Sequence, residues 1–507
     1  MNTAALQDLF QAIEAGDPAP HTSVVVPSLS FDVEELAKIS GAPHYEERLL
    51  FSIMRLRDPR ARVIYLTSQP LHPEIVDYYF GLLVGVSQRS IRSRFQYFCC
   101  YDATARPLTR KILERPRLIE RVRGAMGDPS RAYLTCFNST PLELSLAEKL
   151  GVPLNGCDPA LLDLGSKSGG RELFREVGVP RPEGRERLED RRAVIEALGE
   201  IHEPGLERAV IKLDESFAGA GNALFTYPDP LPEEPAARRA ALGAALEDLR
   251  FTEPSTPAAF FDKLEQMGGV VEHMVKGVEV RSPSVQMRLV PNGELEIVST
   301  HDQILGGQTG QSYAGCRFPA DPAYRAEIQR HARRIGVGLR QRGVVSRFAV
   351  DFVVTRDPQG EWSTYAIEIN LRMGGTTVPF LALQFLTGGH LEEESGQFLD
   401  PTGVHKFYRA TDSLTSPGYR GLLPEDLMDI IDEHGLIFSP ERRCGVLFHM
   451  MGALSEHGKI GVTAIGNSAA EAESFFTRTV EALDSETSQG AAERERPASL
   501  APRMPME

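Results

Sequence analysis

The sequence lacks the cysteine pattern of a secreted or metal-stabilised small protein. Its 507 residues include one tryptophan and six cysteines, and no two cysteines are spaced as Cys-x-x-Cys. Spacings of that kind are needed for zinc ribbons, and a disulfide-stapled domain needs a higher density of cysteine. We therefore expect reduced, structural thiols in a cytosolic protein.

Long apolar runs and an excess of basic residues are also missing. No stretch approaches about 18 apolar residues, so no membrane span is predicted. The first residues, MNTAALQDLFQAIEAG, have no basic segment followed by an apolar one, so we expect no signal peptide. The formal net charge is −15 and the pI is near 5.4. This charge argues against nucleic acid or an anionic membrane as a partner, although it is compatible with a local basic pocket for phosphate.

Two segments resemble common nucleotide-binding motifs, but each lacks a residue that its motif requires. Gly165-Ser166-Lys167-Ser168 resembles a P-loop, but Ser166 stands where that motif needs glycine directly before lysine. Gly219-Ala220-Gly221 lacks the third glycine of G-x-G-x-x-G, because Leu224 occupies its place. Neither a Walker A loop nor a Rossmann fingerprint is therefore supported.

What is present is a globular composition, 42% hydrophobic and 25% charged, over a length typical of about three domains. Alternating strand and helix signals predict a small α/β domain over 1–160, whose loops after Thr67 and Phe137 follow strand ends, where open α/β sheets bind ligands. We assign 161–390 to a central domain and 391–485 to a smaller α+β domain. The remainder, 486–507, is rich in Ser, Gln, Ala, Arg and Pro, and we expect it to be disordered.

The clearest local signal lies in 348–377. Two apolar runs, 348–354 and 364–369, flank the turn signal Asp357-Pro358-Gln359-Gly360 and predict a β-hairpin. Its symmetry places Asp351 opposite Glu368, and strand alternation places Asn370 on the same face as Glu368. Like charges opposite each other are unfavourable, and Mg²⁺, which prefers hard oxygen ligands, would relieve the conflict. The alternative is a solvated carboxylate at a strand end with a salt-bridge partner.

Two further segments suit an anionic nucleotide. A strand carrying Lys212 leads into the small-residue loop 216–222, where Gly219 and Gly221 would let backbone amides approach phosphate. The alternative is a flexible hairpin tip with a solvated lysine. Glu272 and Glu279 flank an apolar stretch that could hold adenine and ribose, or the segment is an ordinary strand–turn–strand.

Polar residues near other strands have two interpretations each. His301-Asp302-Gln303 and Gly306-Gly307-Gln308 follow a strand ending at Thr300, and they would either contact a substrate or form a polar, glycine-rich loop that hydrogen-bonds to itself. Arg281, Arg288 and Arg347 lie on or beside strands, where an arginine faces phosphate or pairs with Asp and Glu.

Taken in order, these segments resemble the ATP-grasp superfamily over about 161–385. Glu368-Ile-Asn370-Leu-Arg372 has its E-x-N-x-R form, and 216–222 resembles its mobile glycine-rich loop. A closer resemblance, to the pheganomycin-type peptide ligases, covers most of the chain. RVIYLTSQPLHPEIVDYYFGLL is similar to their pre-ATP-grasp domain, SKSGGRELFREVGVPRP, EVRSPSVQ and STHDQILGG to their central domain, and GVLFHMMGALSEHGKIGVTAIGNS to their C-terminal domain.

The resemblance implies an α/β and α+β multidomain ATP-grasp fold and a cytoplasmic, ADP-forming carboxylate–amine (peptide) ligase that works through an acyl phosphate. ATP and Mg²⁺ are the implied cofactors, with Mn²⁺ as an alternative to Mg²⁺. A small-molecule acid and an amine, such as amino acids or peptides, are the implied substrates. A homodimer is one assembly to consider. The implied nucleotide contacts are Lys167, Lys212, Ser216, Gly219, Gly221, Asn222, Glu272, Met274, Val275 and Glu279; the metal ligands are Asp351, Glu368 and Asn370; the catalytic residues are Lys212 and Arg372; and the candidate substrate contacts are Arg281, His301, Asp302, Arg347 and Gly374.

Other functions remain to be separated from this one. A small-molecule kinase of the same superfamily would share every site named above, and only its product would differ. A biotin-dependent carboxylase would usually carry a Met-Lys-Met site, which the sequence lacks. A nucleotide-binding module without catalysis would be expected to have lost one of the lysines or carboxylates, and all of them are in place.

Overall fold

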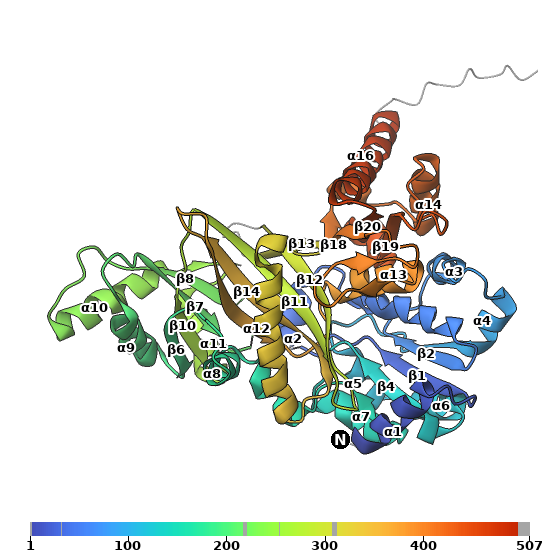
Figure 1. Ribbon diagram of the computed structural model, residues 1–507, viewed down its shortest axis with the longest axis horizontal. Helices are drawn as coiled ribbons and strands as arrows, with labels where there is room; N and C mark the ends of the chain where they lie inside the picture. The colour runs from blue at the N-terminus through green and yellow to red at the C-terminus, as the bar shows by residue number, and fades with distance from the viewer. Residues whose placement is uncertain (1–2, 32, 216–220, 253, 307–311, 495–507) are drawn as a thin grey trace, which may run out of the picture.

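The computed structural model describes residues 3–31, 33–215, 221–252, 254–306 and 312–494. Three parts lie side by side in Figure 1: the N-terminal part in blue, a smaller part in green at the left, and a large central sheet that continues into the C-terminal elements in orange and red. Among the described residues, no helix is long and apolar enough to cross a membrane.

The N-terminal part is a parallel sheet with the strand order β3-β2-β1-β4-β5. Val24, Val25 and Val26 are fully buried, as expected for a parallel strand covered on both faces. Its strands are β1 (His21–Val26), β2 (Ala61–Thr67), β3 (Phe95–Cys99), β4 (Ala132–Cys136) and β5 (Leu154–Asn155), and its helices are α1 (Thr3–Glu14), α2 (Val33–Lys38), α3 (Pro73–Gly81), α4 (Gln88–Arg94), α5 (Leu108–Leu113), α6 (Pro116–Met126), α7 (Pro141–Leu150) and the 3₁₀ helices η1 (Ala42–Arg57) and η2 (Pro129–Arg131). The predicted α/β pattern is present, whereas the long helix η1 was not predicted.

The smaller part holds a second sheet with the order β6-β10-β7-β8-β9. Lys212 lies at the end of β7, where it pairs with Val270 of β10 and Asn222 of β8. The strands are β6 (Gly184–Leu188), β7 (Arg208–Leu213), β8 (Asn222–Thr226), β9 (Arg250–Phe251) and β10 (Gly269–His273); the helices are η3 (Pro159–Gly165), α8 (Lys167–Glu176), α9 (Arg191–Ile201), α10 (Pro235–Ala245), η4 (Leu246–Asp248) and α11 (Pro257–Met267).

The large sheet has the order β15-β14-β11-β12-β13-β18-β20-β19. It contains the predicted hairpin, β14 (Ser346–Arg356) and β15 (Trp362–Asn370), and the register pairs Asp351 with Glu368, as the sequence predicted. The other elements are β11 (Glu279–Leu289), β12 (Leu295–Gly306), β13 (Ser312–Phe318), α12 (Pro322–Gln341), α13 (Thr377–Thr387), β16 (His390–Leu391), β17 (Phe398–Leu399), β18 (Phe407–Thr415), η5 (Pro417–Tyr419), α14 (Pro424–Glu433), β19 (Gly445–His449), η6 (Met451–Ala453), α15 (Leu454–His457), β20 (Lys459–Gly466) and α16 (Ala469–Arg494).

The C-terminal region continues the central sheet and ends in a long helix. Strands β18, β20 and β19 do not form a sheet of their own, because β18 pairs with β13 and so extends the central sheet. Strands β16 and β17 pair with each other in a separate two-stranded sheet. Helix α16 runs to Arg494, so 486–494 is helical where disorder was expected. The rest of the expected tail, 495–507, lies outside the described residues.

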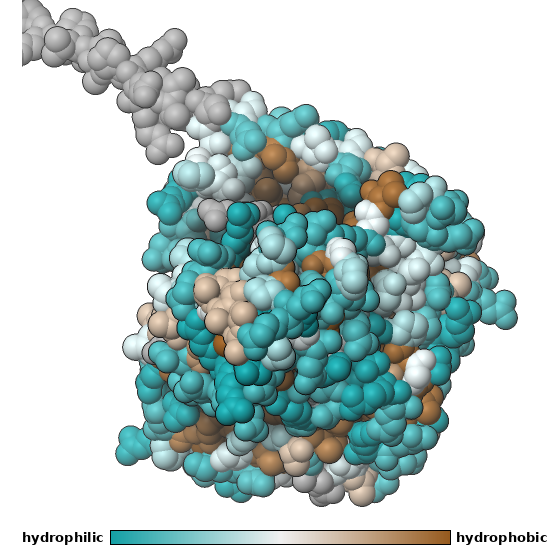
Figure 2. All heavy atoms as spheres, turned by 90° about the vertical axis from the view of Figure 1, so that its left-hand side faces the viewer, coloured by the Kyte–Doolittle hydropathy of each residue, from teal (hydrophilic) through white to brown (hydrophobic). Residues whose placement is uncertain are grey.

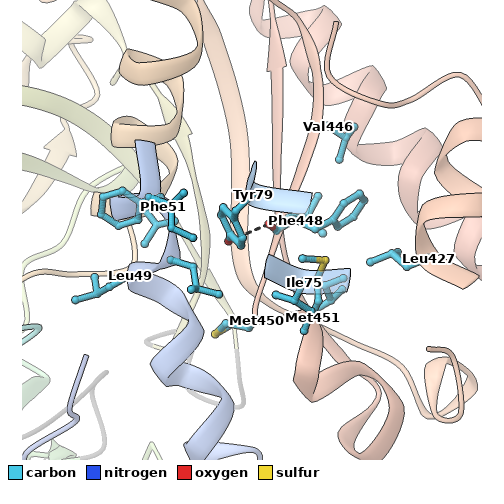
Figure 3. Packing of buried hydrophobic residues seen from close by; sticks show 14 of the residues in the cluster. Leu49, Phe51, Ile75, Tyr79, Leu427, Val446, Phe448, Met450 and Met451 are labelled. Atoms are coloured by element: carbon cyan, nitrogen blue, oxygen red, sulfur yellow. Dashed lines mark hydrogen bonds between the residues drawn. The ribbon is translucent and has the colours of Figure 1, made fainter. Parts of the chain in front are cut away.

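The N-terminal and C-terminal elements share one hydrophobic core (Figure 3). Phe51 of η1, Tyr79 of α3 and Phe448 of β19 belong to this core, and the Tyr79 hydroxyl donates a hydrogen bond to the carbonyl of Phe448. Figure 2 shows a different face of the molecule, which is mainly hydrophilic, with apolar atoms in small patches. Because this core joins both ends of the chain, it fixes the N-terminal part against the large sheet.

Candidate active site

A cavity of about 410 Å³ lies where the three parts meet. The hairpin β14–β15 supplies Asp351, Glu368 and Asn370 to its lining, and the smaller sheet supplies Lys212 and Glu272. Gly374, one of the candidate substrate contacts, also lines it. The predicted metal ligands, one predicted lysine and part of the predicted hinge are thus brought to one place from strands distant in the sequence.

The two hairpin carboxylates face each other inside the protein. Burial is the main cause that raises the pKa of Asp351 to about 7, and the negative charge of Glu368 is the second. Asp351 accepts hydrogen bonds from Gln303 Nε2 at 2.9 Å and from Asn370 Nδ2 at 3.0 Å. A divalent cation would favour the ionised form of both carboxylates, and carboxylate and amide oxygens are the hard donors that Mg²⁺ prefers. This donor set therefore fits a magnesium site.

Cationic side chains surround this carboxylate pair. Lys167 Nζ donates to Glu368 Oε1 at 2.6 Å, so this predicted nucleotide lysine meets a predicted metal ligand. Burial alone would raise the pKa of Glu368, but Lys167 and then Arg372 outweigh it, and the net shift is downward. Arg372 Nη2 donates to Asn370 Oδ1 at 2.8 Å and also lines the cavity.

A second buried charge cluster orients Lys212. The carboxylate of Glu272 accepts hydrogen bonds from Lys212 Nζ and, at 2.6 Å, from Arg171 Nη1. Burial opposes the charge of Glu272, but the two cations outweigh it and lower the pKa of this carboxyl. The predicted adenine-hinge carboxylate thus acts on the lysine through an ion pair as well as lining the cavity.

Part of the predicted hinge lies at the cavity. Met274 and Val275, which follow β10, line the cavity. Glu279, the predicted ribose carboxylate, is not among the described lining residues, and it accepts hydrogen bonds from Arg281 Nε at 2.6 Å and Arg356 Nε at 3.1 Å. Its role toward ribose stays a prediction.

The loop predicted to hold phosphate is described only at its end. Ser216 and Gly219 lie outside the described residues. Gly221 accepts a hydrogen bond from the amide of Leu213, and Asn222, the first residue of β8, lines the cavity.

Four candidate substrate contacts are not among the described residues that line the cavity. His301 is fully buried and pairs with the hydroxyl of Tyr408, and burial lowers its pKa to about 3. Asp302 accepts a hydrogen bond from the Tyr324 hydroxyl at 2.7 Å. Arg281 pairs with Glu279 and Asp321. Arg347 lies opposite Arg288 in the sheet. Burial is the main cause that lowers the pKa of Arg347 to about 9, and the positive charge of Arg288 is the second. The side chains of His301, Asp302 and Arg281 have partners within the protein. The substrate roles of all four residues stay predictions.

The sequence reasoning missed several residues of the site. Arg171 lies four residues after Lys167 in α8, and that helical spacing was a usable signal. Gln303 follows His301 and Asp302 in the segment with a possible substrate role, but its hydrogen bond to Asp351 was not predicted. Arg48 and Asp412 also line the cavity, from η1 and β18, and no sequence pattern connects residues so far apart.

Known proteins were compared with the chain. Residues 248–394 match a family model described as IQCH-like, ATP-grasp, and residues 426–479 match the PGM1 C-terminal domain. The L-propargylglycine–L-glutamate ligase of Streptantibioticus cattleyicolor is 29% identical over 472 residues, covering 91% of this chain and 94% of that protein.

Solved structures support the same fold at low identity. The N5-carboxyaminoimidazole synthetase of Staphylococcus aureus, complexed with ADP, is similar with a TM-score of 0.52 and 12% identity over 91% of this chain and 97% of that one. The biotin carboxylase of Campylobacter jejuni has a TM-score of 0.52 and 12% identity over 89% of both chains. The chain therefore has the ATP-grasp fold, and its similarity to a curated ligase over nearly the whole of both proteins supports an ATP-dependent ligase that forms a C–N bond.

Proposed function

We propose that the enzyme activates a small-molecule carboxylate as an acyl phosphate and transfers the acyl group to an amino acid or peptide amine. The observation that carries this proposal is the convergence of Lys212, the Asp351–Glu368 pair and Arg372 on one cavity. Phosphoryl transfer depends mainly on positioning and charge neutralisation, which these groups can supply without a protein nucleophile. The relative named a propargylglycine–glutamate ligase supports amino acids as the substrate class.

The nucleotide would occupy the side of the cavity formed by the smaller sheet. Val210, Met274 and Val275 offer apolar contacts for adenine, and Lys212 offers a point charge for phosphate. Glu272 holds that lysine in place, and its pairing with Arg171 keeps the carboxylate fixed. An acyl phosphate formed there must also be kept from water.

Asp351, Glu368 and Asn370 would hold Mg²⁺, and Mn²⁺ would fit the same oxygen donors. Bound there, the metal would neutralise charge on phosphate oxygens. Lys167 fixes the Glu368 carboxylate through its 2.6 Å contact, and Arg372 fixes the Asn370 amide.

The chemistry would proceed in two displacements. A carboxylate oxygen of the acid attacks the γ-phosphorus of ATP, the bond to the bridging oxygen breaks, and ADP leaves. The amine then attacks the acyl carbon, loses a proton, and displaces inorganic phosphate to form the amide. Arg372 would bind oxygens of the transferred phosphoryl group, since its guanidinium suits planar oxyanions.

The test is product analysis with ATP, Mg²⁺ and pools of amino acids. Release of ADP and phosphate that depends on both an acid and an amine supports the proposal. AMP and pyrophosphate would refute it, and a stable phosphorylated product without amide would indicate a kinase. Size-exclusion chromatography with light scattering would test the proposed homodimer, and fractionation of cells would test the cytoplasmic location.

A further inference from the structure

A buried ion pair at the cavity wall is not used by the mechanism above. Arg48 Nη2 bonds Asp412 Oδ2, and the two side chains are 5% and 10% exposed. Arg48 comes from η1 in the N-terminal part, and Asp412 comes from β18 in the large sheet. Both residues line the same cavity as Arg372 and the hairpin carboxylates.

The guanidinium of Arg48 is held rigidly and still has hydrogen-bonding capacity. Its Cζ lies 4.1 Å from the centroid of the Tyr45 ring and 5.4 Å from that of Phe137. Within the described part of the chain, its buried Nε has no hydrogen-bond partner. Buried N–H groups without an acceptor are rare in proteins, and arginine presents its donors in a fork that matches a carboxylate. Arg48 is therefore prepared to bind a second anion beside Asp412.

Space is also kept open beside the Asp412 carboxylate. A Cβ atom on Gly375 would lie 3.2 Å from Asp412 Oδ2 and 3.2 Å from the Tyr313 ring, tighter than ordinary contact. Gly375 and Tyr313 line the cavity with the ion pair. A side chain at 375 would thus press on the carboxylate and on the space in front of it.

The simplest alternative is that this ion pair only holds the N-terminal part against the large sheet. That task is already performed by the apolar core around Tyr79 and Phe448. A buried ion pair is in general weak evidence for stabilisation, because desolvation offsets the attraction. A pair that only joined the two parts would also have no reason to border a cavity.

We propose that Arg48 and Asp412 form the head-group site for an α-amino acid that serves as the amine substrate. Arg48 binds the α-carboxylate, and Asp412 binds the α-amino group. A cation and an anion side by side match the two charges of an amino acid, whereas a simple amine would leave Arg48 without its ligand. The acid that is activated belongs beside Arg372 and the metal carboxylates, which leaves this pair for the second substrate. This inference rests on the proposed ligase function.

The test compares each accepted amino acid with the amine that lacks its α-carboxylate, using ADP release by the full-length enzyme. The wild-type enzyme should prefer the amino acid. Arg48→Met should lower kcat/KM for the amino acid by roughly 10- to 100-fold, the range expected for a lost hydrogen bond to a charged group. The same variant should leave kcat/KM for the decarboxylated amine and KM for ATP unchanged.

Two further variants keep the test decisive. Arg48→Met/Asp412→Leu removes both charges, so it leaves no buried ion uncompensated if a single variant fails to fold. Arg55→Met is the matched control, because Arg55 lies in the same helix, stacks on Tyr133 at 5.7 Å and bonds its hydroxyl at 2.6 Å, outside the cavity lining. Arg55→Met should keep the wild-type preference.

Each outcome has one meaning. Equal losses for the amino acid and the decarboxylated amine in Arg48→Met would overturn the head-group site and make the pair structural, and so would a wild-type enzyme without the preference. Absence of amine-dependent ADP release with every amino acid in the wild-type enzyme would instead refute the proposed ligase function.

Discussion

Replacing Glu272 with glutamine should both destabilise the smaller sheet and weaken ATP binding. Glu272 is buried between Lys212 and Arg171, whose side chains are 9% and 1% exposed. Removal of its charge leaves the Lys212 ammonium buried without its counter-ion, while Arg171 keeps its 3.2 Å contact with Glu186. Breaking a buried pair in this way lowers the free energy of unfolding by about 3–5 kcal/mol. Because Arg171 keeps a partner, we expect a loss of about 3 kcal/mol for Glu272→Gln.

Lys212→Met is the matched comparison for this prediction. Glu272 would still be paired with Arg171, so the loss of stability should be only about 1–2 kcal/mol, while KM for ATP should rise at least as much as in Glu272→Gln. Urea denaturation gives the free energies of unfolding, and hydrogen exchange in β7 and β10 shows whether the loss is local. A Glu272→Gln protein with wild-type stability and wild-type KM for ATP would refute the argument that this carboxylate positions Lys212.

Three other changes test separate parts of the structure. Glu368→Gln should abolish ADP release while circular dichroism shows an intact fold, because it removes a proposed metal ligand and the partner of Lys167; near-full activity would exclude Glu368 from the metal site. Burial raises the pKa of Glu46 to about 7 despite its bonds to Ser68, so its stabilising contribution is fully present below pH 4.5 and is lost as the pH rises through 7. Glu46→Gln should therefore flatten the dependence of unfolding free energy on pH between these values by about 3 kcal/mol, measured in urea. Phe448→Ala should cost about 3–5 kcal/mol by opening the core shared by both ends of the chain, and an unchanged denaturation midpoint would contradict that packing.

The sequence alone determined the local chemistry of the hairpin. Apolar runs and a turn signal sufficed to pair Asp351 with Glu368, because side-chain alternation and turn position set the register of a short antiparallel pair. These features depend on residues close together in the chain.

Only the tertiary structure decided which distant groups meet. The pairing of β13 with β18 joins the C-terminal strands to the central sheet, and no local pattern encodes such a long-range contact. The structure also pairs His301 with Tyr408 and Arg281 with Asp321, and neither residue is among those described as lining the cavity, since burial and neighbouring side chains, not residue type, decide where a polar group points. The ion pair of Arg48 and Asp412 joins residues 364 positions apart, so its place at the cavity wall follows from the packing of three chain segments and could not be found from the sequence.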